Sequence, residues 1–389
     1  MTTSASRLRE LLRAEAAGGV SLSVGMTIAL LWSGVAPDSY HDFWHYRFSA
    51  STLSTWHIGN PHEVVANAIL TIFFFGVGLE LARELRHGHL TDKKNAIMPA
   101  LAALGGMAAT ALFAVFLGTT SHTPELTKGW GVPMATDIAF ALGALALVGR
   151  RIPRELRIFL LTLAIVDDVL SVIALALSDP SKMQPLYLAL LPATVFLLSF
   201  KSRQRMVLTM LTRVVATWLV LAAANVEPCL AGALVGLVAP FGSNPEASER
   251  LERHVVILAT WVALPLFALT ACGIDWRTIS WTGDTWTFVG LMAVARLVGK
   301  VIGIVGVVAL ASRLRLGARP GNLKQLAALS SLCAVGFTVP LLFAEQAYGA
   351  TNPTYFQTTA ALLAISVLAA IIGCAGLWVT GSSTKGNEQ

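Results

Sequence analysis

The chain has 389 residues, of which 55% are hydrophobic and only 13% are charged. Soluble globular domains carry about 25% charged residues, so the composition excludes an ordinary soluble protein and predicts an all-α protein that spans a lipid bilayer many times. The formal net charge of +6 says little about a nucleic-acid partner, which we do not expect, because basic residues also collect in the cytoplasmic loops of membrane proteins.

Three arginines, Arg7, Arg9 and Arg13, precede the first apolar stretch, near 18–36. This order imitates a secretion signal. The stretch is longer than a signal core and lacks a clear A-x-A site, so we interpret it as a first span that is retained. The leucines of the basic segment fall on one helical face, which predicts a helix over 1–17 that lies on the cytoplasmic membrane surface.

Apolar segments recur along the whole chain, and we count twelve. They lie near 18–36, 62–82, 96–118, 127–149, 156–177, 186–200, 206–224, 228–241, 254–273, 286–311, 325–345 and 357–380. With the N-terminus in the cytoplasm, 21 of the 28 Lys and Arg residues fall in cytoplasmic segments and 4 in outside loops. This alternation predicts twelve spans with both termini in the cytoplasm.

The longest outside segment contains RFSASTLSTWHI at 47–58, where β-branched and aromatic residues would suit either a short hairpin or an irregular loop. The polar tail at 381–389 is expected to be disordered. The four cysteines all fall in apolar segments without metal-ligand spacing, so we expect no cofactor held by them.

Four charged residues stand near the centres of three predicted spans. They are Asp137, the adjacent pair Asp167 and Asp168, and Lys300. Each Asp costs roughly 2.5–3.5 kcal/mol to insert at a helix centre, and none of these side chains can easily reach the membrane surface. We therefore expect them to face one another or a water-filled cavity. Three acids against one base leave excess negative charge that a mobile cation or proton would balance, which indicates a cation- or proton-coupled transporter.

Two spans carry helix-breaking residues near mid-depth. Gly131 and Pro133 precede Asp137 in GWGVPMATDIAF, and Gly336 and Pro340 lie in SSLCAVGFTVP. These are the fourth and eleventh spans, and the triplets of spans around them have opposite orientations. The pattern predicts inverted repeats with two broken helices crossing at the midplane, where exposed carbonyls and helix ends could bind an ion.

The chain resembles the NhaA family of sodium/proton antiporters nearly end to end. The resemblance is carried by AAGG near the start, GVGLELARELRHG, ATDIAFALGALALVG, FLLTLAIVDDV, LAGALVG, RLER, LPLFA, VGK and GFT. It implies exchange of Na⁺ or Li⁺ for protons, electrogenic and regulated by pH, in a bacterial inner membrane, with no cofactor besides the transported ions. It also implies a homodimer, for which 47–58 is a candidate contact.

The resemblance assigns roles to the central residues. Asp168 and Asp167 would exchange protons for the cation, with Thr136 as a further oxygen ligand. Lys300 would pair with Asp167 and offset the negative helix ends at the crossing. Asp137 would offset the positive helix ends. Hard oxygen ligands of this kind suit an alkali cation.

A second group of residues is connected with the pH response of the family. Some of them match the family's motifs, and others stand where the motifs have a different residue. The group consists of Glu80, Arg83, Glu84, Glu227, Glu252, Arg253 and His254. Glu80, Arg83 and Glu84 would otherwise be read as an ordinary interfacial ion network. Glu227 and Arg253 stand where the motifs have histidine, although His254 is adjacent, so the pH set point is the least transferable property.

Two further departures lie near the central site. Pro340 replaces the usual small polar residue after GFT. Arg296, one turn before Lys300, is an extra cation that either neutralises part of the acidic cluster and weakens cation affinity or pairs with another acid. The expected organisation is one membrane domain with an ion-binding core at 96–177 and 286–380. Interface or scaffold helices would occupy 18–95 and 186–273.

Three other functions explain the sequence less well than cation/proton exchange. A symporter of an organic anion would need a roomier pocket than this small charged site offers. An intramembrane aspartyl protease needs only two acids, and the chain lacks a G-x-G-D motif. A scaffold without transport leaves the mid-depth charges unexplained. We therefore expect a secondary transporter and not an enzyme.

Overall fold

The computed structural model describes residues 2–49, 56–87, 93–148, 152–178, 183–197, 206–239, 245–277, 279–317 and 319–381. Within these ranges the chain is helical or irregular, and no strand occurs. The α-helices are α1 (Thr2–Val35), α2 (Pro37–Trp44), α4 (Pro61–Glu63), α5 (Leu70–His87), α6 (Lys93–Thr120), α7 (Pro124–Lys128), α8 (Ile138–Val148), α9 (Arg154–Leu177), α10 (Pro185–Leu188), α11 (Met206–Ala223), α12 (Ala231–Leu237), α13 (Pro245–Leu258), α14 (Leu264–Ala271), α15 (Gly283–Arg313), α16 (Leu323–Leu332), α17 (Thr338–Tyr348) and α18 (Pro353–Gly381). Short π-helical stretches η1 (Val64–Ile69), η4 (Ala193–Leu197) and η7 (Ala259–Ala263) and a 3₁₀ turn η6 (Pro228–Leu230) complete them.

Eight helical stretches of the described residues are long and apolar enough to cross a bilayer. They are Ala17–Val35, Pro61–Arg86, Ala96–Thr120, Glu155–Leu177, Met206–Ala223, Glu246–Ala271, Gly283–Arg313 and Pro353–Thr380. Each coincides with one of the twelve predicted segments. The protein is thus an all-helical, multi-pass membrane protein, as the composition predicts. The other four segments are either shorter apolar helices or are interrupted.

The structure describes only part of the chain ends and of the predicted outside loop, so it tests the predictions for them only in part. Helix α1 runs without a break from Thr2 into the first span, and the placement of 1–17 on a membrane surface stays a prediction. Residues 50–55 and 382–389, which hold most of the predicted hairpin and tail, lie outside the described residues. At the edges of that loop the Phe48 N–H donates to the Gly59 carbonyl at 2.9 Å.

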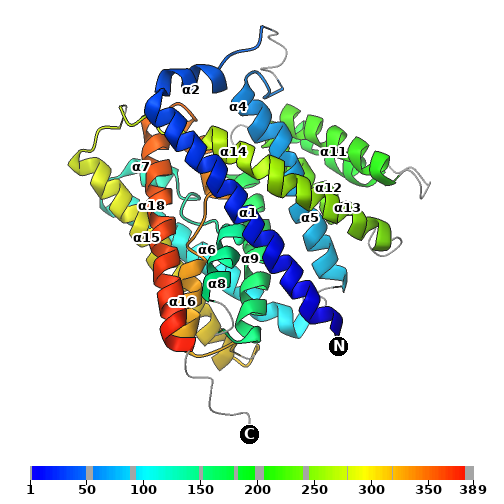
Figure 1. Cartoon of the computed structure of the whole chain (residues 1–389), viewed down its shortest axis with the longest axis vertical. Helices are drawn as coiled ribbons and strands as arrows, with labels where there is room; N and C mark the ends of the chain where they lie inside the picture. The colour runs from blue at the N-terminus through cyan, green and yellow to red at the C-terminus, as the bar shows by residue number, and fades with distance from the viewer. Residues whose placement is uncertain are drawn as a thin grey trace. The chain divides into compact units, whose positions relative to one another are not determined.

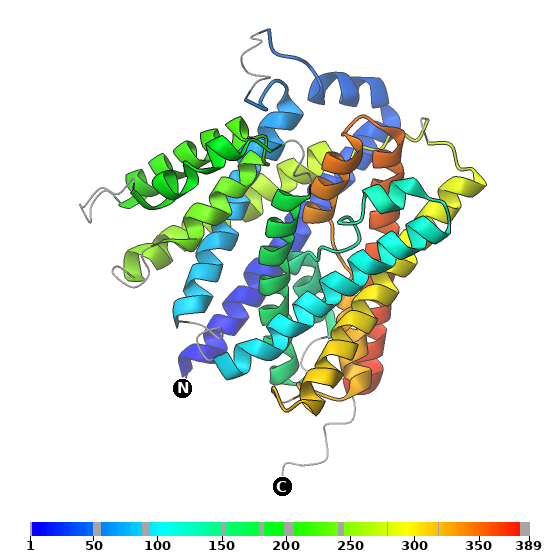
Figure 2. The same cartoon turned by 180° about the vertical axis from the view of Figure 1, so that it is seen from behind.

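The chain divides into two compact units. The first comprises the described parts of 1–19, 92–172 and 274–389. Its helices α6 and α15 run side by side (Figure 2). They can approach closely because their contact is made of glycines: a Cβ on Gly303 would overlap the Gly105 carbonyl, and a Cβ on Gly299 would lie 2.8 Å from the Thr110 Cα. Helix α18 packs on α16 in the same unit.

The second unit comprises the described parts of 20–91 and 173–273. Helix α12 packs along α5 there, α13 contacts α5, and α11 contacts α12 (Figure 1). Close approach again depends on glycine, because a Cβ on Gly236 would lie 2.7 Å from the Phe75 carbonyl oxygen. The expected ion-binding core falls mostly in the first unit and the expected scaffold mostly in the second, although the boundaries differ by up to 13 residues and 1–19 also belongs to the first unit. Those roles stay predictions.

Candidate functional site

Two non-helical stretches of the first unit are hydrogen-bonded to each other. Residues 129–137 separate α7 from α8, and residues 333–337 separate α16 from α17. The Asp137 N–H donates to the Val335 carbonyl at 3.0 Å, and the Thr136 hydroxyl donates to the Cys333 carbonyl at 2.6 Å. Both helices are therefore interrupted where Gly131, Pro133 and Gly336 stand, and the interruptions meet. Pro340, by contrast, lies in the first turn of α17, where its missing N–H needs no partner.

Asp137 lies at the amino-terminal ends of two helices at once. One carboxylate oxygen accepts the Phe140 N–H at 3.4 Å, at the start of α8. The other accepts the Thr338 N–H at 3.4 Å and the Thr338 hydroxyl at 3.1 Å, at the start of α17. A negative charge at these positions satisfies free N–H groups and complements the positive ends of both helix dipoles. Thr338 was not among the predicted site residues, although it stands in the GFT motif directly after the break.

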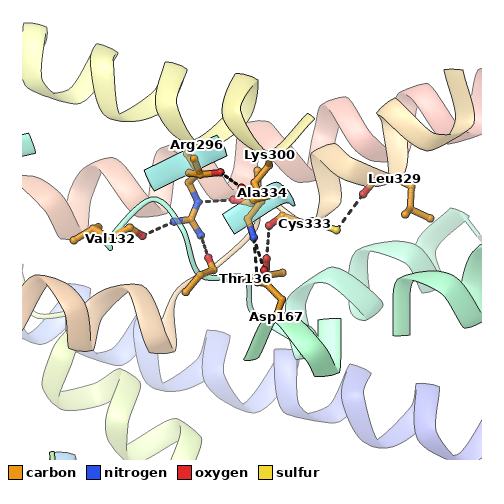
Figure 3. A network of polar contacts seen from close by, with 11 residues as sticks. Val132, Thr136, Asp167, Arg296, Lys300, Leu329, Cys333 and Ala334 are labelled. Carbon is orange, nitrogen blue, oxygen red and sulfur yellow. Dashed lines mark hydrogen bonds and ion pairs between the residues drawn. The ribbon is translucent and has the colours of Figure 1, made fainter. Parts of the chain in front are cut away.

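Lys300 and Asp167 form an ion pair that is completely buried. The ammonium group lies 2.8 Å and 3.0 Å from the two carboxylate oxygens, and neither side chain is exposed. Asp167 also accepts the Thr136 N–H at 3.1 Å, which ties α9 to the interruption before α8 (Figure 3). A buried pair of this kind is costly to break by removing one partner, because the other charge is left without compensation.

Asp168 follows on the same helix and is 5% exposed. One turn later, the hydroxyl of Ser171 is buried and has no hydrogen-bond partner among the described residues. Buried hydroxyls are nearly always paired, so this one indicates a position that a water molecule or an ion can occupy. Ser171 was not predicted from the sequence, and its spacing from Asp167 and Asp168 on one helical face is the signal that could have found it.

Arg296 has partners that the sequence did not predict. Its guanidinium group donates to three backbone carbonyls: Ala334 at 2.6 Å, Val132 at 2.9 Å and Ala135 at 2.8 Å. The sequence offered only carboxylate partners for this cation. The structure instead uses it to satisfy carbonyls that the two helix interruptions leave without helical N–H donors.

A second ionic cluster lies in the other unit and joins α5 to α13. Arg83 Nε lies 2.9 Å from Glu252, and its other nitrogens lie 3.2 Å from Glu84 and 3.9 Å from Glu80. The four side chains are between 6% and 16% exposed. Three carboxylates around one guanidinium leave an excess of negative charge in a mostly buried place.

The remaining residues of the predicted regulatory group lie elsewhere. Arg253 and His254 are exposed on α13, and a ring nitrogen of His254 lies 2.7 Å from the Arg250 carbonyl. Glu227 is half-buried and directly precedes the 3₁₀ turn η6. Of the seven predicted residues, the structure thus brings Glu80, Arg83, Glu84 and Glu252 into one cluster.

Comparison with known proteins covers almost the whole chain. The profile of the family described as Na⁺/H⁺ antiporter 1 matches residues 9–377. The Na(+)/H(+) antiporter NhaA 2 of Frankia alni is 38% identical over 97% of this chain and 80% of its own length. The protein of the same name from Rhodococcus jostii is 36% identical over 97% and 93% of the two chains. The Na(+)/H(+) antiporter NhaA of Serratia proteamaculans is 35% identical over 94% and 96%. The chain therefore belongs to the NhaA family of Na⁺/H⁺ antiporters.

Proposed function

We propose that this chain exchanges Na⁺ or Li⁺ for protons across a bacterial inner membrane through a site built on Asp167 and Asp168. The observation that carries the proposal is the position of these two buried carboxylates beside the meeting point of two interrupted helices. Carboxylate oxygens bind hard alkali cations, and burial disfavours the charged form of a carboxyl group. A proton and a cation can then compete for the same oxygens, and competition at one site forces exchange.

The topology that suits this function has twelve spans. Eight helical stretches qualify by length, and two shorter apolar helices, Pro185–Phe196 and Pro228–Leu237, match two further predicted segments. The last two predicted segments are the interrupted ones, α7–α8 and α16–α17. Opposite orientation of the two triplets that contain them would make inverted repeats crossing at the midplane. The pattern of basic loops supports a cytoplasmic location for both termini.

The proposal also includes a homodimer with its contact at 47–58, which rests on the family resemblance. Tyr46 and Trp56, at the edges of this segment, are 62% and 38% exposed and offer apolar surface. Deletion of 47–58 should convert the detergent-solubilised protein from dimer to monomer in a light-scattering measurement of mass. An unchanged mass would exclude this contact.

The function is tested with purified protein in liposomes that hold a preset pH gradient. Addition of Na⁺ or Li⁺ should dissipate the gradient, and K⁺ should not. Asp167→Asn and Asp168→Asn should each reduce the rate at least about 100-fold while the protein stays folded, because each removes a carboxylate charge that would bind the ion. Asp167→Asn should also lower Tm, because the buried Lys300 ammonium group loses its charge partner. Asp284→Asn is the matched control, since Asp284 is exposed in the first turn of α15.

Full exchange activity in either site variant would refute the assignment of the site. Absence of any gradient collapse by the folded wild-type protein, at every pH tested, would refute the proposed function itself.

A further inference from the structure

Two cations project from neighbouring turns of α15, and they bind different kinds of group. Among the residues that the structure describes, the Lys300 side chain donates only to the Asp167 carboxylate. Within the described ranges, the Arg296 side chain donates only to backbone carbonyls, and it is the largest side chain there that is completely buried. Figure 3 shows the two side chains pointing from the same helix into the meeting point of the interrupted segments. Because Lys300 binds a carboxylate and Arg296 binds backbone carbonyls, we infer that the two cations have different roles.

The guanidinium group connects both interrupted segments to α15. Val132 and Ala135 belong to the stretch before α8, and Ala334 belongs to the stretch after α16. A planar guanidinium has five N–H donors in a fixed fork, so it can hold three carbonyls at once, which a single ammonium point charge cannot do with the same geometry. Room for the fork depends on Gly336, because a Cβ there would overlap the guanidinium group.

Asp137 and Arg296 at the meeting point therefore each bind backbone groups of the opposite partial charge. Asp137 faces free N–H groups at the starts of α8 and α17, and Arg296 faces free carbonyls of the two interruptions. Lys300 makes no hydrogen bond to a carbonyl of either stretch in the part of the chain that the structure describes. The three carbonyls that Arg296 holds are satisfied without it.

We propose that Arg296 is a positioning residue that holds the two interrupted segments together, so that Lys300 is released from this structural task and serves only as the partner of Asp167. The proposal rests on the proposed function for the role of Asp167. It differs from the division of tasks that the family resemblance implies, in which Lys300 both pairs with Asp167 and offsets the helix ends.

The hydrogen bonds of Arg296 to the three carbonyls, called here the Arg296 clamp, are connected to the proposed ion site through one peptide group. Arg296 holds the Ala135 carbonyl, and the next N–H, that of Thr136, donates to Asp167 at 3.1 Å. Loosening the clamp would therefore shift Thr136 relative to the carboxylates. A shift of Thr136 disturbs the oxygen ligands of a small ion more than it slows the movement of the protein. The effect should therefore appear in the apparent KM for Na⁺.

The test compares Arg296→Gln, Arg296→Lys and Lys300→Gln by thermal unfolding in detergent and by Na⁺-dependent exchange in liposomes. Lys300→Gln should lose most exchange activity and lower Tm, because the buried Asp167 carboxylate loses its charge partner but keeps the Thr136 N–H. Arg296→Gln should lower Tm more. Arg296→Lys keeps the charge but not the fork, and should raise the apparent KM for Na⁺ about tenfold with a smaller change in maximal rate.

Arg213→Gln is the matched control, because Arg213 is also a mostly buried arginine within a span but belongs to the other unit. It should leave the apparent KM for Na⁺ unchanged. A merely structural role of Arg296 would lower Tm and leave the KM of Arg296→Lys at the wild-type value, which would overturn the proposal.

Two other results would overturn it as well: a fall in Tm for Lys300→Gln as large as for Arg296→Gln, or failure of Lys300→Gln alone to fold. If neither glutamine variant is obtained folded, the KM of Arg296→Lys decides. Failure of the proposed function is distinguishable, since the wild-type protein would then show no exchange while the order of Tm values could still be measured.

Discussion

Asp137 is the residue whose contacts are most unusual for an acid inside a membrane protein. A single carboxylate at a helix start normally satisfies the N–H groups of one helix, but here one oxygen serves α8 and the other serves α17. Both helices begin inside an apolar region where no bulk water can replace the lost bonds. The side chain therefore stabilises the start of two helices together.

We predict that Asp137→Ala lowers the free energy of unfolding by about 2–3 kcal/mol, because one lost cap costs roughly 0.5–2 kcal/mol and two are lost together with a favourable charge. Asp137→Asn should cost less, since an asparagine oxygen also caps well. Thermal unfolding of the purified variants in detergent measures both effects.

Asn322→Ala calibrates this prediction, because Asn322 caps only one helix, α16, through a bond of 2.8 Å to the Gln325 N–H. A smaller loss for Asp137→Ala than for Asn322→Ala would contradict the double-cap interpretation.

The sequence predicted residues with charged side chains well and their backbone partners poorly. Asp137, Asp167, Asp168 and Lys300 stand out because a charge in an apolar run is rare and costly. The partners of Arg296 are carbonyl groups, which every residue carries, so no residue type marks them. Only the three-dimensional course of the two interrupted stretches brings those carbonyls together.

Helices α6 and α15 are the elements whose packing decides where the two buried cations lie. Gly299 and Gly303 are four residues apart on α15 and flank Lys300, and both face the backbone of α6. Small residues at this spacing let helix backbones touch, as is common in membrane proteins. The depth to which Lys300 and Arg296 reach therefore depends on a glycine contact.

We predict that Gly303→Ala pushes α15 away from α6 and reduces both Tm and exchange activity, because the new Cβ would overlap the Gly105 carbonyl. Gly306→Ala is the control on the same helix, since a Cβ there would meet no atom within 4 Å. Alanine favours helix formation over glycine by about 1 kcal/mol at both positions, so only the packing term differs.

Tm should therefore fall for Gly303→Ala and rise slightly for Gly306→Ala, and only Gly303→Ala should slow the collapse of the pH gradient. Equal Tm and equal activity of Gly303→Ala and Gly306→Ala would show that the glycine contact has no role.

The pairing of α5 with α13 depends on Arg83 and Glu252. We predict that Glu252→Gln changes the pH dependence of exchange, because it removes one of three carboxylates that share a single mostly buried guanidinium group. Glu246→Gln is the control: Glu246 lies on the same helix, but its side chain is 88% exposed. Gradient collapse is measured for both variants across a range of pH.

A pH profile of Glu252→Gln that coincides with those of the wild type and Glu246→Gln would reduce the Arg83 cluster to an interfacial ion network. A fall in the Tm of Glu252→Gln without a change in its pH profile would lead to the same conclusion.

At the level of elements, the positions of the apolar segments and the two interrupted spans could be predicted, but the form of the two short segments and the place of Pro340 could not. Pro185–Phe196 and Pro228–Leu237 are short, and hydropathy alone does not say whether a short apolar run crosses a bilayer. Pro340 was expected to interrupt its span, yet the break lies at 333–337 and the proline begins α17. Proline is as compatible with the first turn of a helix as with a kink.

Two helices of the first unit, α6 and α18, expose apolar side chains where spans are expected to meet lipid. Val367, Ile371 and Val379 on α18 are 60%, 60% and 67% exposed, and Leu112 and Phe116 on α6 are 68% and 62% exposed. Such surfaces are stable in a bilayer and not in water. Exchange of ions must therefore take place inside a low-dielectric shell, where the membrane potential acts on any net charge that moves.

The charges of the central site predict whether each exchange cycle moves net charge across the membrane. With Asp137, Asp167 and Asp168 negative and Lys300 and Arg296 positive, the empty site carries one net negative charge. One Na⁺ would balance it, whereas two protons would leave one net positive charge. If the site crosses in these two states, each cycle moves net charge, in agreement with the electrogenic exchange that the family resemblance implies.

We predict that exchange in liposomes accelerates when the membrane potential is clamped at zero with valinomycin and equal K⁺ on both sides. Without the clamp, each cycle builds a potential that opposes the next one, at about 2.3 kcal/mol per charge per 100 mV. The rate of internal pH change after Na⁺ addition measures the effect, and Asp168→Asn vesicles control for ionophore leak. A rate that does not respond to the clamp would mean neutral one-for-one exchange and would contradict the electrogenic exchange that the family resemblance implies.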